Sequence, residues 1–357
     1  MSNRVYLRPT AFVDSPIGLD GKAQRLAGGL TWFSAVEVLT DQGIAELLPV
    51  EAVETALARL GDEARSGWER LIAPRPALVL GHRTIRLDQP QVMGIVNATP
   101  DSFSDGGVHE DAGAAAEAGM GMTALGAAII DVGGESTRPG SATVWEGDEL
   151  RRVLPVIEQL AGAGTAISID TRKASVMEAV LSIGPALIND VSALVYDSRA
   201  LAVVAAAGCP VVLMHHQGDP ATMQKAPHYD RTVLLDVYDW LERRIEEVTA
   251  KGIARERILI DPGIGFGKTL RHNLDLMNGL SLFHGLGCPI LLGASRKRMI
   301  GALSNEAPPE KRLAGSLALA LKAAEQGAQI IRVHDVAETV QALRVWRGLR
   351  DAALTLP

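Results

Sequence analysis

Cysteine and aromatic residues are both scarce in this chain of 357 residues. Its two cysteines, Cys209 and Cys288, each stand directly before a proline at the start of an apolar run. Two thiols in matching positions of this kind indicate buried packing residues rather than a disulfide or a metal site. Aromatic residues make up 4% of the chain, whereas glycine occurs 36 times. Such a composition is typical of parallel sheets covered by helices.

Long apolar runs and blocks of like charge are also missing. No apolar run approaches the roughly 18 residues needed to span a bilayer, and the N-terminus lacks the apolar stretch of a signal peptide. The net charge is −7, which argues against broad nucleic-acid binding. We therefore expect a soluble cytoplasmic protein, in a reducing compartment, without membrane or nucleic-acid partners.

The first 75 residues do not share the pattern of the rest of the chain. Arg4–Val13 and Thr31–Leu39 are predicted strands, and Pro49 is predicted to open a helix. That helix would have one apolar face, formed by Val53, Leu57, Leu60, Ala64, Trp68 and Leu71. No His, Cys or acidic cluster occurs here, so we expect an accessory segment, 1–75, of unknown role. Residues 76–357 follow the Pro-rich linker at 73–76 as a second unit, beginning with a hairpin at 77–88.

From Val92 onward, eight strand-like runs alternate with helix-like stretches. The predicted strands are 92–97, 128–132, 166–170, 187–191, 210–215, 258–261, 289–292 and 330–334. This count and length indicate an α/β fold, a (β/α)₈ TIM barrel with an N-terminal accessory segment. A doubly wound open sheet would instead need a G-x-G-x-x-G turn after an early strand, and the sequence has none.

Polar residues stand at the end of every predicted strand. In a barrel these ends lie on one face, so their side chains would converge on one pocket. The residues are Asn97, Asp131, Glu135, Asp170, Asn189, Asp190, His215, Asp261, Ser295, Lys297, Arg332 and His334.

Buried together, these carboxylates and amides need hydrogen-bonding partners. A flat heterocycle with ring N–H, amino and carbonyl groups would satisfy Asp170, Asn189 and Asp261, and Lys297 or Arg332 would cover its face or its carbonyl. Asn97, Thr137, Arg332 and His334 could hold an anion together with Mg²⁺. Separate heterocycle and polyanion pockets suggest group transfer with a phosphate leaving group.

Eight motifs in this order resemble those of the dihydropteroate synthase family, over residues 78 to 350. They are NATPDSFSDGG (97–107), DVGGESTRPGS (131–141), SIDTRK (168–173), INDVSAL (188–194), LMHHQG (213–218), DPGIGFGKT (261–269), GASRK (293–297) and RVHDV (332–336). The resemblance does not extend to residues 1–75.

The resemblance implies condensation of 6-hydroxymethyl-7,8-dihydropterin pyrophosphate with p-aminobenzoate, giving dihydropteroate and pyrophosphate in folate biosynthesis. In the family, pyrophosphate leaves first and the arylamine then attacks, with Mg²⁺ as cofactor. A homodimer and inhibition by sulfonamides are also implied.

The same resemblance implies roles for individual residues. The implied pterin residues are Asp170, Asn189, Met214, Asp261, Lys297 and Arg332. The implied pyrophosphate residues are Asn97, Thr137, Arg138, Arg332 and His334, with Asn97 also on the metal. The implied p-aminobenzoate residues are Phe103, Thr137, Pro139, Phe266, Ser295 and Lys297. The implied catalytic residues are Asp105, Asp170, Lys297 and Arg332, with Asp105 or Asp170 stabilising the cation left by pyrophosphate.

Several alternatives stand beside this interpretation. GIGFGKT is not a nucleotide loop, because Pro262 occupies the position of its first glycine. His215 and His216 face opposite ways on a strand and cannot share one metal. Ile264 and His216 depart from the residues usual in the family. A pterin-binding methyltransferase and a non-catalytic pterin-binding paralogue remain the alternative functions.

Overall fold

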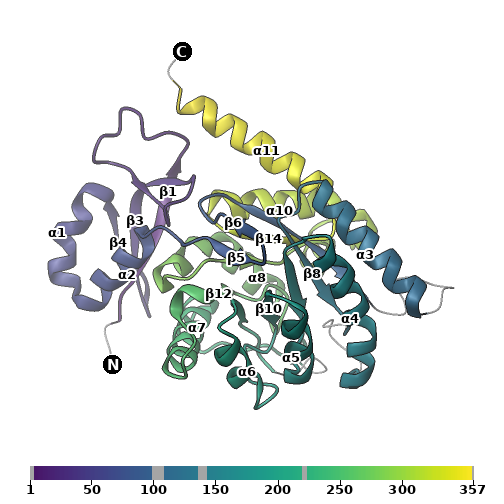
Figure 1. The fold of residues 1–357 in the computed structure, drawn as a ribbon. Helices are drawn as coiled ribbons and strands as arrows, with labels where there is room; N and C mark the ends of the chain where they lie inside the picture. Colours follow the sequence, from purple (N-terminus) through teal and green to yellow (C-terminus); the bar gives the residue numbers. More distant parts are fainter. Residues whose placement is uncertain (1–3, 99–107, 136–142, 219–222, 356–357) are drawn as a thin grey trace.

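The computed structural model describes residues 4–98, 108–135, 143–218 and 223–355. Residues 4–72, the N-terminal module, form an antiparallel sheet with two helices beside it (Figure 1). Its strands and helices are β1 (Tyr6–Val13), β2 (Gln24–Arg25), β3 (Trp32–Thr40), β4 (Gly43–Pro49), α1 (Val50–Leu60) and α2 (Asp62–Ile72).

The module differs from the sequence prediction in three places, the first being the short strand β2, which pairs with β3 and was not predicted. Residues 43–49 form strand β4, which pairs with β3 and was not predicted. The single predicted helix is broken at Gly61, whose φ of 93° lies in the left-handed region that glycine adopts without strain. Asp62 and Glu63 then begin α2, where acidic side chains favour a helix N-terminus. The apolar faces of both helices pack with Phe33 and Val36 of β3 in a core of their own.

Eight parallel strands form the barrel. They are β7 (Gln91–Asn97), β8 (Ile129–Gly133), β9 (Ile167–Asp170), β10 (Ala186–Asp190), β11 (Val211–Met214), β12 (Ile258–Asp261), β13 (Leu291–Leu292) and β14 (Ile330–Val333). Their order is β12-β11-β10-β9-β8-β7-β14-β13, and a bridge between Ile260 and Ile290 joins the two ends of this series. The predicted (β/α)₈ barrel is therefore confirmed.

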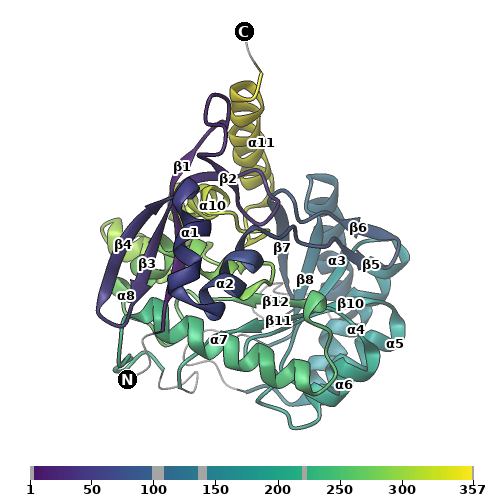
Figure 2. The same ribbon diagram turned by 90° about the vertical axis from the view of Figure 1, so that its left-hand side faces the viewer.

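Helices cover the outside of the barrel (Figures 1 and 2). They are α3 (Val108–Ala124), α4 (Glu146–Gly162), α5 (Ala174–Ile183), α6 (Ala200–Ala207), α7 (Val233–Ala250), α8 (Leu270–Asn278), α9 (Arg298–Leu303), α10 (Leu313–Glu325) and α11 (Val336–Ala353). Short 3₁₀ helices occur at η2 (Arg255–Arg257), η3 (Leu280–Leu286) and η4 (Pro309–Lys311). No helix in the described ranges combines the length and apolarity that a membrane crossing requires.

A hairpin of β5 (Leu78–Leu80) and β6 (Arg83–Ile85) closes the N-terminal end of the barrel. Its apolar side chains Leu78, Leu80 and Ile85 form one buried cluster with one residue from each of seven barrel strands and with Ala166, which directly precedes β9. The strand members are Met93, Ile129, Leu187, Val212, Leu259, Leu291 and Ile330. This end is thus filled with hydrocarbon, which leaves the C-terminal end of the strands for a polar site.

The N-terminal module packs against the barrel through both backbone and side-chain contacts. β1 and α2 lie against η3, and the hydroxyl of Ser281 in η3 donates to the Pro9 carbonyl at 2.8 Å. Arg75, in the linker, is buried and donates to the carbonyl of His284 at 2.9 Å. Arg350 of α11 donates to the carbonyls of Val13 and Leu30. The module is therefore part of the folded body of the protein.

Candidate active site

Arg332 of β14 binds carboxylates from two other strands at the C-terminal end of the barrel. Its Nε lies 2.6 Å from Oδ2 of Asp131 on β8, and its Nη2 lies 2.9 Å from Oδ2 of Asp170 on β9. The amide of Asn189 on β10 donates to the same Asp131 oxygen at 3.0 Å. Residues 162 and more positions apart in the chain thus meet because parallel strands carry them to one end.

The two carboxylates of this cluster each retain an oxygen without a partner. Asp131 and Asp170 are buried, and their Oδ1 atoms have no hydrogen-bond partner among the described residues. Burial, together with the Asp131 carboxylate, raises the pKa of Asp170 to about 7 despite the nearby Arg332 cation. Buried acceptors that lack partners are costly. The site is therefore built to receive hydrogen-bond donors from a ligand.

Asp261 of β12 lies across the barrel mouth from this cluster. Its Oδ1 accepts a hydrogen bond from the Gly263 backbone N–H at 2.7 Å, and Met214 is its neighbour in register on β11. Gly293, which follows β13, has the side chains of both Arg332 and Asp261 within 4.0 Å of the place where a Cβ would lie. Burial raises the pKa of Asp261. Asp261 and Arg332 therefore face one space, and the glycine keeps that space open.

Lys297 follows β13 and reaches the loop after β12. Its ammonium donates to the Ile264 carbonyl and lies 4.6 Å from the centre of the Phe266 ring. Burial lowers the pKa of Lys297 to about 8, against the attraction of the Asp261 carboxylate. The side chain of Ile264, one of the family departures, is itself fully buried. The Ile264 backbone rather than its side chain thus contacts the site.

The 262–269 loop depends on its glycines for close packing. Gly263 and Gly267 have φ of 70° and 65°, and a Cβ at these positions would lie 1.9 Å from the His215 carbonyl oxygen and 2.5 Å from that of Gln217. Glycine is required at both positions for conformation and for space. The loop therefore packs directly against the end of β11 instead of cradling a nucleotide phosphate.

Lys268 was not among the predicted site residues, although it is one of the most buried cations of the chain. Its Nζ lies 2.9 Å from Nδ1 of His215 and donates to the Phe266 carbonyl at 3.0 Å. Burial lowers the pKa of both Lys268 and His215. His215 is thus a hydrogen-bonded wall residue, and no signal in the sequence indicated that Lys268 would pair with it.

Three more predicted residues lie at the rim of the mouth. The Ser295 hydroxyl lies 3.1 Å from Nδ1 of His334, so the ends of β13 and β14 are joined. Asn97, the last residue of β7, is exposed and stands beside Gly133 of β8 in register. These positions are suited to holding a group that projects out of the barrel.

The acidic residues whose role the sequence left open fall into two groups. Glu135 accepts hydrogen bonds from Arg172 at 3.0 Å and Lys173 at 2.9 Å, and so braces the chain after β8. Asp190 accepts from the Ser192 N–H at 2.7 Å and holds the turn after β10. Asp131, by contrast, faces Arg332 inside the mouth. It belongs to the site, as its position on the same inward face as Gly133 of β8 could have indicated.

Five predicted site residues, Phe103, Asp105, Thr137, Arg138 and Pro139, lie outside the described residues. Within the described ranges, no group of three or more His, Cys, Asp or Glu side chains could hold a metal. The exposed Asn97 amide is an oxygen donor of the kind that Mg²⁺ accepts. Such a donor fits an Mg²⁺ ion that keeps most of its bonds to water and to substrate phosphate.

A cavity of about 750 Å³ lies beside the mouth, under the segment that follows β11. His215, Tyr229, Arg231 and Trp240 are among its lining residues. Its lining does not include Arg332, Asp170 or Lys297. The cavity thus adjoins the polar cluster without containing it.

Comparison with known proteins gives consistent matches over the barrel. The family described as pterin binding enzyme matches residues 93–334. The dihydropteroate synthase of Escherichia coli (strain K12) is 51% identical over 263 residues, which are 73% of this chain and 92% of that protein.

Two solved structures are similar to this one. The Yersinia pestis dihydropteroate synthase with a sulfonamide drug complex has a TM-score of 0.73 at 48% identity, covering 77% of this chain and 99% of that chain. The Xanthomonas albilineans dihydropteroate synthase in complex with 7,8-dihydropteroate has a TM-score of 0.70 at 45% identity, covering 79% of this chain and 100% of that chain. Roughly a fifth of this chain therefore has no counterpart in those two structures.

Proposed function

The chain belongs to the pterin-binding enzyme family, among its dihydropteroate synthases, and from this premise we propose how its residues carry out the reaction. The protein is a transferase of folate biosynthesis. It condenses 6-hydroxymethyl-7,8-dihydropterin pyrophosphate with p-aminobenzoate and releases dihydropteroate and pyrophosphate.

The observation that carries the assignment of the pterin pocket is the Arg332 cluster with its unpartnered carboxylate oxygens. The pterin edge presents amino and ring N–H groups, and Asp170 and Asp261 would accept hydrogen bonds from them. Asn189 is buried beside them and pairs with both donors and acceptors. Met214 packs in the same pocket, and Arg332 and Lys297 would bind the pterin from the β13–β14 side.

The p-aminobenzoate pocket is proposed to lie where Lys297 meets Phe266. A flat arylamine fits beside an aromatic ring, and the Lys297 ammonium and the Ser295 hydroxyl offer donors to its carboxylate. Phe103, Thr137 and Pro139 would complete this pocket from the loops after β7 and β8. The Yersinia pestis relative was solved with a sulfonamide drug, so sulfonamides should compete with p-aminobenzoate here.

Pyrophosphate would be held at the rim by Asn97, Thr137, Arg138, Arg332 and His334. Cations and N–H donors at this position stabilise the charge that develops as the C–O bond breaks. When bound, Mg²⁺ would neutralise the leaving pyrophosphate, with the Asn97 amide as its protein ligand.

The proposed order is dissociation before attack. The C–O bond electrons leave with pyrophosphate, and the carboxylate of Asp105 or Asp170 stabilises the remaining pterin-methylene cation. The arylamine nitrogen then forms the new C–N bond and loses its proton to solvent. No strong general base is needed, since the cation is a better electrophile than the starting ester.

A direct assay tests this function. Purified protein with dihydropterin pyrophosphate, p-aminobenzoate and Mg²⁺ should form dihydropteroate and pyrophosphate in equal amounts. Tight pterin binding without product would identify a non-catalytic paralogue, and methyl transfer from methyltetrahydrofolate to a corrinoid would identify a methyltransferase. The homodimer and the cytoplasmic location stay predictions.

A further inference from the structure

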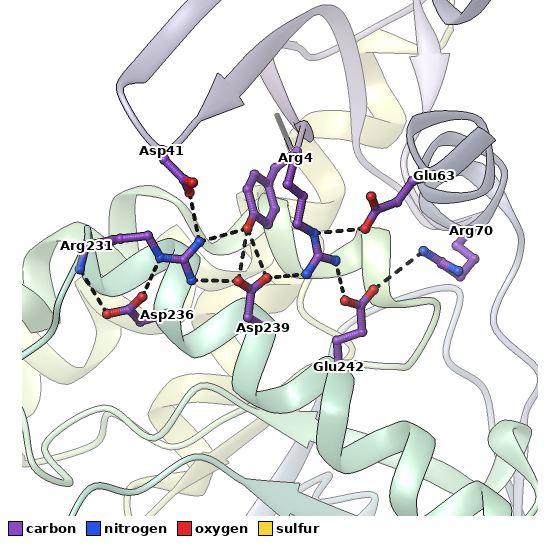
Figure 3. Close-up of polar contacts among 9 residues, drawn as sticks. Arg4, Asp41, Glu63, Arg70, Arg231, Asp236, Asp239 and Glu242 are labelled. Atoms are coloured by element: carbon purple, nitrogen blue, oxygen red, sulfur yellow. Dashed lines mark hydrogen bonds and ion pairs between the residues drawn. The ribbon is translucent and has the colours of Figure 1, made fainter. Parts of the chain in front are cut away.

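Arg231 connects the N-terminal module to the barrel segment that follows β11. Its guanidinium contacts Asp41 in the β3–β4 turn at 2.8 Å and the Tyr6 hydroxyl of β1 at 3.1 Å. On the barrel side it contacts Asp236 at 2.8 Å and Asp239 at 2.6 Å, both in α7 (Figure 3). One cation thus takes partners from the module and from the enzyme core.

The module reinforces this connection with a second cation. Arg4 binds Asp239 at 2.7 Å and also Glu242, on the same face of α7 (Figure 3). The Tyr6 hydroxyl lies 3.0 Å from Asp239, and its ring packs edge-on against Tyr238. Tyr6 and Asp239 are both buried. Such a connected, partly buried network holds its members more firmly than isolated surface pairs do.

The residues just before Arg231 hold the 262–269 loop. The Tyr229 hydroxyl donates to the Gly267 carbonyl at 2.9 Å, and the Gln224 amide donates to the Gly265 carbonyl. His228 is fixed by two hydrogen bonds with Gln217, whose amide donates to the His228 carbonyl at 2.6 Å. Residues 223–231 therefore lie between the module and the loop that carries Phe266.

That loop directly contacts a residue of the proposed substrate pockets, because Ile264 and Phe266 both contact Lys297. Contacts thus run from Asp41 and Tyr6 to Arg231, the backbone connects Arg231 to Tyr229, and Tyr229 contacts the loop opposite Lys297.

We propose that the N-terminal module is a positioning element of the active site, and that Asp41 and Tyr6 set the geometry of the p-aminobenzoate pocket through Arg231. The part of this inference that concerns p-aminobenzoate rests on the proposed function. The part that concerns the position of the 262–269 loop does not. The module holds residues 223–231, which in turn hold the 262–269 loop at the distance that Lys297 requires.

The test compares two double variants of the full chain. Asp41→Asn with Tyr6→Phe removes one charge and one hydroxyl at Arg231 while keeping the Tyr6 ring in place. Glu46→Gln with Ser34→Ala is the control, because it also removes one charge and one hydroxyl, but at contacts inside the module. Glu46 pairs with Arg59, and Ser34 donates to the Ala11 carbonyl. Each protein is measured for kcat, for KM of both substrates and for amide hydrogen exchange.

In the Asp41/Tyr6 variant we expect KM for p-aminobenzoate to rise roughly threefold to tenfold, because the pocket wall is less well positioned. We expect kcat and the KM for dihydropterin pyrophosphate to stay within about twofold. Amide exchange should become faster in residues 223–231 and 262–269, and the Glu46/Ser34 variant should match the wild type in every measurement.

Unchanged exchange in both segments would overturn the proposal, as would equal kinetics in the two double variants. If the Asp41/Tyr6 variant does not fold, Asp41→Asn alone, at a half-exposed turn position, is subject to the same criteria. A wild-type protein without turnover would contradict the proposed function instead, and the exchange measurements would still decide whether the module holds the loop.

Discussion

The Lys297 ammonium group is held by the Ile264 carbonyl and by the face of the Phe266 ring. Burial lowers its pKa to about 8, which means that the folded protein gains little from keeping the charge there. We therefore expect that removing this charge does not destabilise the fold.

We predict that Lys297→Ala lowers turnover by roughly 100-fold or more, the effect of removing one well-placed donor from an active site. The midpoint of thermal unfolding should change by less than about 3 °C. Steady-state kinetics and a melting curve on the same preparation check both parts. Near-normal turnover would show that Lys297 does not contact substrate.

Arg332 differs from Lys297, because two carboxylates depend on it. Above about pH 7, where Asp170 is ionised, Arg332→Ala leaves Asp131 and Asp170 without their cation, and breaking a buried pair in this way costs about 3–5 kcal/mol. We predict loss of turnover together with a clear fall in the free energy of unfolding, measured by denaturant titration. Arg199→Ala, which removes a surface pair with Glu178, is the control and should change neither. Full stability in Arg332→Ala would mean that the two acids are protonated or solvated.

Asp170 makes pterin binding dependent on pH. Its raised pKa of about 7 means that the free protein holds this proton near neutrality, so its contribution to stability is lost as pH rises through about 7. A ligand that donates N–H groups needs the ionised carboxylate. We predict that pterin affinity rises between about pH 6 and 8 and that binding near pH 6 releases a proton.

Calorimetry in buffers of different ionisation enthalpy measures this proton release. In Asp170→Asn the affinity should be weaker and independent of pH over the same range. An unchanged pH dependence in this variant would assign the titration to another group.

At the scale of elements, the 262–269 loop shows how glycine serves packing as well as conformation. Gly267 and Gly164 have similar positive φ values of 65° and 70°, but only Gly267 lies against another backbone, since nothing lies within 4 Å of a Cβ at Gly164. The pair therefore separates the cost of strain from the cost of a clash.

We predict that Gly164→Ala costs about 1–2 kcal/mol of stability, from backbone strain alone, and leaves kinetics unchanged. Gly267→Ala should cost more and should also raise the KM of p-aminobenzoate, because the clash with Gln217 displaces the loop. Chemical unfolding and kinetics of the two variants provide the comparison. Equal behaviour of the two variants would show that the loop tolerates the displacement.

The barrel elements were predictable because each is a short apolar run that ends in polar residues. The same rule failed for β4, where Ile44 and Leu47 are exposed and the run carries a glutamate and a terminal proline. The break at Gly61 was missed because one apolar face continues through both α1 and α2.

Within the site, the sequence placed Asp170, Asn189, Asp261 and Arg332 at one end of the barrel, and the structure brings them there. Asp131 was predicted to face the pocket but was given no role of its own, whereas Lys268 was not predicted to belong to the site. The pairing with Arg332 distinguishes Asp131 from an acid that only braces the chain. Lys268 depends on His215, 53 residues away, and spacing along the chain does not predict such a contact.

At the scale of the whole molecule, the module and the barrel share an extensive interface. The contacts include the buried Arg75, the Ser281–Pro9 hydrogen bond and the Arg4 and Arg231 network. An interface of this kind couples the stability of the two parts.

We therefore predict a single unfolding transition. Leu57→Ala, in the core of the module, should cost about 2–5 kcal/mol and lower the temperature at which activity is lost by the same amount as the temperature at which the fold melts. Circular dichroism and residual activity after heating measure the two. Two separate transitions, with activity surviving the first, would show that the barrel is stable without the module.

The barrel wall has a weak seam between β12 and β13. In the described part of the chain, one bridge, between Ile260 and Ile290, pairs these two sides of the wall. Asp261 and Lys297 emerge on opposite sides of this seam. A molecule that touches both clasps the two sides together, so its binding energy also resists opening of the wall. Thermal denaturation thereby becomes a screen for inhibitors, in which compounds that reach across the seam protect the enzyme more than equally tight compounds that contact one side.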